Sequence, residues 1–133
     1  MIQAIKLING AQSGDQGKVV VDVHPNRPEY RGMLTPTGVA ISLEADPSFD
    51  EIEKAGAILE KNGESHTVLN DMFLVSGEIP RTTAYELGIR GGIRYTPGTE
   101  KWVSDELISD ERLVVCNLKG KPTMEQLVIS ADA

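Results

Sequence analysis

Three of the six arginines, Arg81, Arg90 and Arg94, lie in one glycine-containing stretch of the chain, where Glu86 is the one opposing acid. A guanidinium group binds a carboxylate or phosphate through two parallel hydrogen bonds, and backbone N–H groups near glycines can approach the same anion. The stretch therefore predicts a site for a small anionic ligand. A solvated loop, in which each arginine faces water, is the alternative.

Four further residues could belong to such a site. Glu78 precedes Arg81 by three positions, so the two could form an ion pair or face a ligand. His24 ends a predicted strand, where active-site residues of open sheets often lie. Asp105 and Asp110 are spaced so that one loop could carry both carboxylates. The alternatives are a surface ion pair for Glu78 and Arg81, a structural or supporting role for His24, and solvated caps for the two aspartates.

The chain offers few ligands for a transition metal. Its histidines are His24 and His66, and its one cysteine is Cys116. A catalytic zinc typically needs about three protein ligands, so we expect no resident metal and no other cofactor. Cys116 lies in an apolar run with no base beside it, which is typical of an inert core thiol. Residues 88–92 match no phosphate-binding fingerprint, because the lysine and the strand-turn-helix context are missing.

The composition excludes several classes of protein. The chain has 133 residues, 40% of them hydrophobic, which predicts one domain over residues 1–133. A net charge of −7 argues against a nucleic-acid partner, whose phosphates require clustered cations. No apolar run approaches the ~20 residues that span a bilayer, and no signal peptide is apparent, so we expect no membrane partner and a cytoplasmic location.

Periodicity predicts an α/β protein in which helices and strands mix along the chain. Ser48 and Glu51 form a capping box that begins the clearest helix. The predicted helices cover residues 1–8 and 48–61, the strands 19–23, 38–43, 113–118 and 127–130, a β-hairpin 66–76, and loops 26–36 and 82–99. The apolar strand 19–23 is predicted to lie in the interior of a sheet.

Longer stretches carry a resemblance to a known family. Residues 76–88, 102–113 and 115–121 resemble the middle of a metallo-β-lactamase-fold hydrolase, in the branch that includes dihydropterin ribofuranosylaminobenzene phosphate synthase-like proteins. The block Ser-Gly-Glu-Ile-Pro-Arg at 76–81 is the most specific part. His24-Pro25 and Arg31-Gly32 are also similar to that branch. The resemblance implies a mixed sheet with helices on one face, as in part of one half of an αββα sandwich.

The resemblance does not extend to the family's metal-binding motifs. Neither His-x-His-x-Asp-His nor Gly-Cys-Ser-His-Ala-Gly occurs in the sequence, and without a metal the water that attacks the substrate is not acidified. We therefore expect a non-catalytic or degenerate module that forms a homo-oligomer and binds a small anion. One alternative is a metal-dependent hydrolase whose site is completed between subunits by His24, His66 and Asp105 or Asp110. Another is a subunit that docks on a full-length relative.

Overall fold

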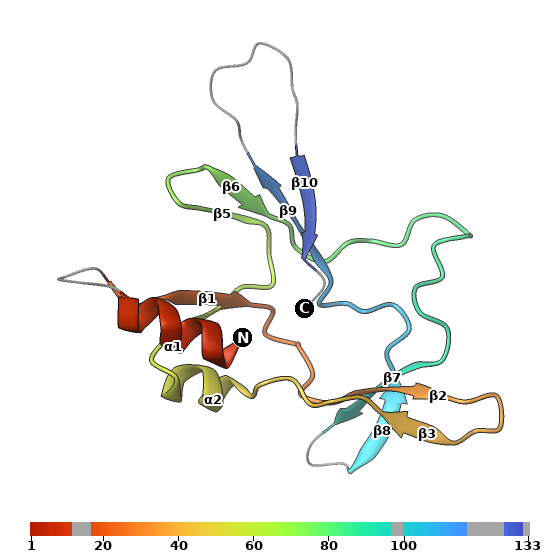
Figure 1. The fold of residues 1–133 in the computed structure, drawn as a ribbon. Helices are drawn as coiled ribbons and strands as arrows, with labels where there is room; N and C mark the ends of the chain where they lie inside the picture. The colour runs from red at the N-terminus through yellow and green to blue at the C-terminus, as the bar shows by residue number, and fades with distance from the viewer. Residues whose placement is uncertain (12–16, 97–99, 117–126, 132–133) are drawn as a thin grey trace.

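The computed structural model describes residues 1–11, 17–96, 100–116 and 127–131, which form helices and three sheets (Figure 1). The chain therefore belongs to the α/β class in the general sense. Instead of one mixed sheet, the described strands divide into a parallel pair and two antiparallel sheets. No helix among the described residues is long and apolar enough to cross a membrane.

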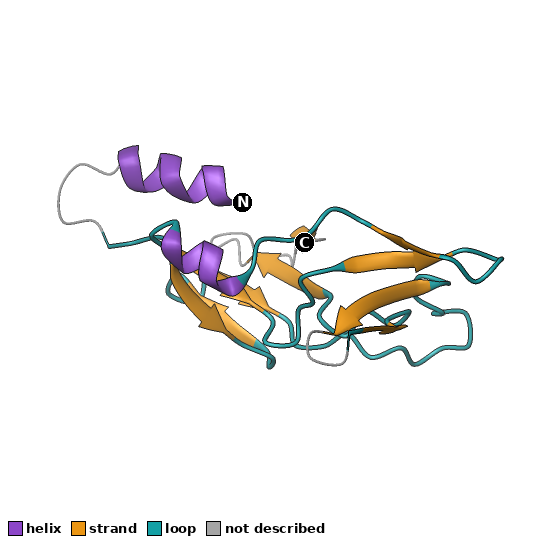
Figure 2. Cartoon of the chain, turned by 90° about the horizontal axis from the view of Figure 1, so that it is seen from below, coloured by secondary structure: helices purple, strands orange, loops and turns teal. Residues whose placement is uncertain are grey.

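The first unit contains both helices and the parallel pair of strands. It consists of α1 (Ile2–Ala11), β1 (Val20–Val23), α2 (Phe49–Lys54) and β4 (Ile58–Lys61). Figure 2 shows both helices on the same side of this strand pair. Ile5 of α1, Ile52 of α2 and Ala57 form the buried cluster between them. Ser48 and Glu51 cap α2 reciprocally, which confirms the predicted capping box.

Two antiparallel sheets follow. The second sheet has the order β10-β9-β6-β5 and contains β5 (His66–Val68), β6 (Phe73–Val75), β9 (Arg112–Cys116) and β10 (Leu127–Ala131). The third has the order β3-β2-β7-β8 and contains β2 (Arg31–Leu34), β3 (Ala40–Ser42), β7 (Gly92–Thr96) and β8 (Lys101–Ser104). Figure 1 shows the three sheets lying apart, with long loops between them.

Several predicted elements are confirmed. The N-terminal helix, strand 19–23, strand 38–43, hairpin 66–76 and strand 127–130 correspond to α1, β1, β3, the β5–β6 pair and β10. The hairpin turns through Leu69, Asn70 and Asp71, which all have positive φ. Strand 113–118 corresponds to β9 up to Cys116, and the predicted turn at 119–122 lies outside the described residues.

The helix predicted over 48–61 is wrong in its second half. The α-helix ends at Lys54, and Gly56 adopts a φ of +98°, a left-handed conformation that stops a helix. Residues 58–61 then form β4, which pairs with β1. β1 pairs with no other described strand, so its predicted interior position is also wrong.

The predicted loops 26–36 and 82–99 each contain a strand of the third sheet. β2 lies in the first and β7 in the second. Gly32 is typical of a loop in the sequence, yet it lies within β2. A Cβ at this position would come within 2.5 Å of the Ile41 carbonyl oxygen and 3.0 Å of the Trp102 ring, so a larger residue does not fit. Glycine at this position allows close packing of β2 against β3 and the indole of β8.

Few apolar side chains are buried. Those of the described residues are Ile5, Val23, Ile52, Ala57, Val75 and Ile93. The chain exposes 9498 Å² of surface, whereas a compact monomer of 14.4 kDa exposes about 6,800 Å². The excess includes many large apolar side chains, which a stable protein in water has to cover.

Candidate functional site

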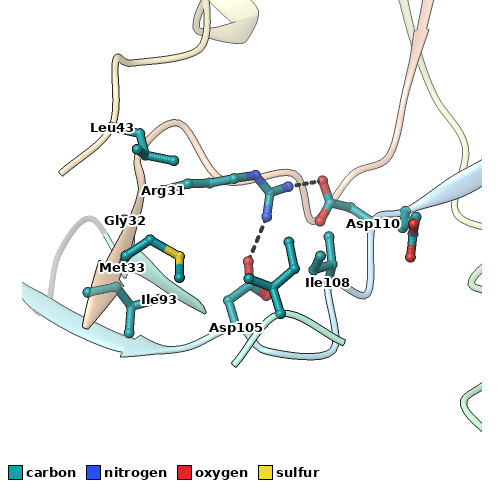
Figure 3. A pocket seen from close by; sticks show the side chains of 10 residues that line it. Arg31, Gly32, Met33, Leu43, Ile93, Asp105, Ile108 and Asp110 are labelled. Atoms are coloured by element: carbon teal, nitrogen blue, oxygen red, sulfur yellow. Dashed lines mark hydrogen bonds and ion pairs between the residues drawn. The ribbon is translucent and has the colours of Figure 1, made fainter. Parts of the chain in front are cut away.

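Arg31 and two aspartates form the polar centre of a pocket beside the third sheet (Figure 3). Arg31 begins β2, Asp105 directly follows β8, and Asp110 lies in the loop that leads to β9. Arg31 Nη1 donates to Asp105 Oδ2 at 2.7 Å, and Nη2 donates to Asp110 Oδ2. Only 7% of the Asp105 side chain and 5% of the Asp110 side chain are exposed. The structure therefore brings both predicted aspartates onto one guanidinium group.

The remaining walls of this pocket are mainly apolar. Its volume is about 190 Å³, and it opens to solvent. The apolar lining comes from Met33, Leu43, Ile89, Ile93 and Ile108. Ile108 has a φ of +49°, a conformation that a β-branched residue adopts only under strain. The loop between β8 and β9 therefore holds a strained residue in the pocket wall, between the two aspartates.

The two carboxylates differ in their surroundings. Burial raises the pKa of Asp105 above its usual 3.8, although the Arg31 and Arg94 guanidinium groups act in the opposite direction. Only the Oδ2 atom of Asp110 accepts a hydrogen bond from Arg31. The Oδ1 atom of Asp110 is buried and has no hydrogen-bond partner among the described residues. An unsatisfied buried acceptor costs about 1–3 kcal/mol, and more when it is charged. Asp110 Oδ1 is thus a free acceptor in an otherwise paired cluster.

The arginines of the predicted anion site already have acceptors within the chain. Arg81 Nη2 lies 2.5 Å from Glu111 Oε2, and it does not pair with Glu78. Arg94 Nη1 donates to the Asn26 carbonyl at 3.1 Å, and its Nε lies 3.9 Å from Asp105 Oδ1. Arg90 is exposed and has no hydrogen-bond or ion-pair partner among the described residues. An anion would have to compete with carboxylates for two of the three guanidinium groups.

His24 and Glu78 line a second, more polar pocket of about 570 Å³. β1 and β4 are parallel, so the residues that follow them, His24 and 63–65, lie at the same edge of the strand pair. His24 Nδ1 accepts a hydrogen bond from the Asn26 N–H at 3.1 Å. Glu64 and Ser65 add a carboxylate and a hydroxyl to the polar lining of this pocket.

Sequence reasoning missed a third cluster, centred on Asp22 of β1. Arg112 Nη1 donates to Asp22 Oδ1 at 2.6 Å, and Asn62 Nδ2 donates to Asp22 Oδ2 at 2.7 Å. His66 Nε2 lies 2.5 Å from the same Oδ2. These contacts join the first unit to the second sheet. The one available signal was a single charged residue inside the apolar run 19–23.

The cluster around Asp22 favours the charged forms of Asp22 and His66. Burial acts to raise the pKa of Asp22, but hydrogen bonds from Arg112, Asn62 and His66 hold it below its usual 3.8. The pKa of His66 is raised above 6.5, first by the Glu64 carbonyl, which lies 3.0 Å from Nδ1, and also by Asp22; burial and Arg112 oppose this. Both ring nitrogens face acceptors, so the protonated ring fits the site best.

We expect the stability of the protein to fall as pH rises through the folded-state pKa of His66. A histidine whose pKa is raised by folding contributes its full stabilisation at pH values below its unfolded-state pKa of 6.5. This contribution is lost as the pH rises above its folded-state pKa. The expected loss is about 1 kcal/mol or less, as for other partly exposed pairs. Urea denaturation at a series of pH values compares the wild type with His66→Gln, which does not titrate. Parallel curves for the two proteins between pH 6 and 8 (about the range in which histidine titrates) would contradict the expectation.

The predicted metal ligands do not gather at one place. Asp105 and Asp110 bind Arg31, whereas His66 binds Asp22 and His24 lines the other pocket. Within the described residues, no group of three or more histidine, cysteine, aspartate or glutamate side chains could hold a metal ion. The described residues of one chain therefore bring together no donor set of the kind that a catalytic zinc needs.

Comparison of the chain with protein-family models, with curated proteins and with solved structures finds no match.

Proposed function

We propose that this chain is a non-catalytic binding module, related to the substrate-loop region of metallo-β-lactamase-fold hydrolases, that associates with a second copy of itself. In this proposal the parallel strand pair with its two helices corresponds to part of one half of an αββα sandwich. The ion pairs within the chain support a non-catalytic role, because Arg31, Arg81 and His66 each bind a carboxylate of the chain.

The observation that carries the proposal is the apolar face of β3. Ile41 lies at the centre of β3, and Val39 and Leu43 flank the strand with hydrogen bonds that continue its pairing with the β2 side. The three residues alternate with Ala40 and Ser42, so their side chains share one face. Their exposed fractions are 59%, 53% and 53%. Full burial of an aliphatic side chain of this size contributes about 1.5–3 kcal/mol. We call these three residues the β3 apolar face.

β3 also ends its sheet, because it pairs only with β2 among the described strands. An edge strand presents unpaired N–H and C=O groups that can pair with another strand. Residues 39–43 carry no charge, so two copies can meet here without the repulsion that a chain of net charge −7 has elsewhere. Two antiparallel β3 strands related by a two-fold axis would form an isologous interface. This self-complementarity favours a second copy over an unrelated partner.

We expect Ile41→Lys to convert a dimer into a monomer. Ile41 lies at the centre of the β3 apolar face, and burying two lysines at the interface would remove its apolar contacts and add like charges. Sedimentation equilibrium at micromolar concentration measures the mass of each protein.

Val103→Lys is the matched control for this experiment. Val103 of β8 pairs with Arg94 of β7, which pairs in turn with Arg31 of β2, beside Leu43. Val103 therefore lies on the same side of the third sheet as the β3 apolar face but at the opposite edge, and it is 40% exposed. We expect this variant to remain a dimer. A monomeric wild type, or equal masses for the wild type and Ile41→Lys, would overturn the proposal.

A further inference from the structure

We infer that the pocket beside Arg31 binds a small molecule with a short apolar body and a head group that donates hydrogen bonds, best a cationic amine. The inference does not depend on self-association, although Leu43 belongs both to the pocket wall and to the β3 apolar face. Its basis is the buried acceptor on Asp110, the carboxylates around it and the apolar wall opposite.

The free acceptor defines the head group. The Asp110 side chain is 5% exposed, and its Oδ1 has no partner among the described residues. Figure 3 shows this second oxygen on the side of the carboxylate that faces Ile108. A donor that reaches it past the Ile108 side chain would satisfy the acceptor without displacing Arg31, which binds the other oxygen.

The charges that line the pocket favour a cation over an anion. Asp105, Asp110 and Glu111 contribute three carboxylates, and Arg31 is the one cationic residue of the lining. Both terminal nitrogens of Arg31 already donate to the aspartates. Outside the lining, Arg81 binds Glu111 and Arg94 lies near Asp105. An anion would have to compete with two aspartates for the Arg31 guanidinium group and would meet the carboxylates of the lining, whereas a cation would meet a carboxylate oxygen that has no partner among the described residues.

The apolar wall and the volume define the body of the ligand. Met33, Leu43, Ile89, Ile93 and Ile108 surround a space of about 190 Å³. Pockets for drug-sized ligands are larger, about 300–1,000 Å³. The body is therefore a short or single-ring hydrocarbon. The strained backbone of Ile108 fits this assignment, because strain tends to persist where a segment holds a ligand.

Three probes with one body and different heads test the inference: cyclohexylamine, cyclohexanol and cyclohexanecarboxylate at matched ionic strength and pH 7. Methyl NMR of isoleucine, leucine and methionine reports binding at Met33, Ile89 and Ile93. We expect cyclohexylamine to bind at least tenfold more tightly than the carboxylate, with the alcohol between them. Tightest binding of the carboxylate, or no shift of these methyl signals with any probe, would overturn the inference.

Two variants locate the head and the body. Asp110→Asn should weaken cyclohexylamine binding at least tenfold, whereas Glu53→Gln, which removes a charge from the exposed face of α2, should leave it unchanged. Ile89→Trp should block all three probes by filling the pocket; Ile89 is 49% exposed, so the larger ring need not disturb the fold. Unchanged binding to Ile89→Trp would overturn the inference even if Asp110→Asn does not fold.

The same titration in Ile41→Lys separates the pocket from self-association. We expect cyclohexylamine to bind this variant as it binds the wild type. If the wild type is a monomer and still binds cyclohexylamine, the proposed assembly is overturned and the pocket is not. Loss of binding specifically in Ile41→Lys would overturn the assignment of the pocket to a single chain.

Discussion

Replacing Arg112 with methionine is expected to lower the free energy of unfolding by about 3 kcal/mol, as when one partner of a buried ion pair is removed. Arg112 donates to the carboxylate of Asp22 at 2.6 Å and also to the carbonyl oxygens of Asn62 and Asp22, each at 3.3 Å. Only 14% of the Arg112 side chain and 18% of the Asp22 side chain are exposed. Methionine retains an apolar stem but removes the arginine charge from Asp22, which keeps only His66 and Asn62 as side-chain partners where the first unit meets the second sheet.

Urea denaturation at pH 7 measures this effect, with Arg90→Met as the control. Arg90 is exposed and has no partner among the described residues, so its replacement should change the free energy of unfolding by about 0.5 kcal/mol or less. The pKa of Asp22 is lowered in the fold, so its contribution is present above the unfolded value of 3.8 and is lost as pH falls through the folded value. The difference between the wild type and Arg112→Met should therefore shrink in acid. Equal losses for both arginine variants at pH 7 would contradict the expectation.

Local signals predicted most of the elements that depend on neighbouring residues. The capping box at Ser48 and Glu51 begins α2, and the turn at Asn70 and Asp71 joins β5 to β6. The end of α2 was missed because residues 57–61 continue an apolar helical stripe. Gly56 is compatible with a helix interior at a cost of about 1 kcal/mol, and only the pairing of β4 with β1 makes the strand preferable.

Apart from β3, the strands of the third sheet could not be predicted because their local signals are weak. β2 contains Gly32 and β7 begins at Gly92, and both glycines are typical of loops when the sequence is considered alone. In the structure, Gly32 lies opposite Ile93 in the β2–β7 ladder, with Trp102 packed beside it. Such glycines are required by partners that are distant in sequence, so local periodicity does not reveal their role.

The candidate site was predicted only in part, because some of its residues are close in sequence and others are distant. Asp105 and Asp110 are close in sequence, and their meeting on one loop followed from spacing. Arg31, which binds both, is 74 and 79 positions away. Asp22 and Arg112 are 90 positions apart, and their contact depends on how the second sheet is placed against β1. The charge pairs that determine the electrostatics of this protein are therefore set by tertiary structure.

Replacing Gly88 with alanine should also be severely destabilising, with a loss of at least about 3 kcal/mol, which lies in the range caused by backbone clashes and strain. Gly88 has a φ of +67°, and a Cβ there would overlap the carbonyl oxygen of Glu106 and lie 2.8 Å from its carbonyl carbon. That oxygen accepts a hydrogen bond from the Ile89 N–H at 2.8 Å, so it cannot move away without breaking the contact between the two loops.

Gly38→Ala separates the clash from the effect of positive φ. Gly38 has a φ of +82°, but no atom lies within 4 Å of the position that its Cβ would take. Its replacement should cost only the backbone strain, about 1–2 kcal/mol. Thermal or urea denaturation of both variants gives the comparison, and a loss for Gly88→Ala no greater than for Gly38→Ala would show that the Glu106 carbonyl yields. Because Ile89 follows Gly88 and lines the pocket beside Arg31, Gly88→Ala should also weaken cyclohexylamine binding, whereas Gly38→Ala should not.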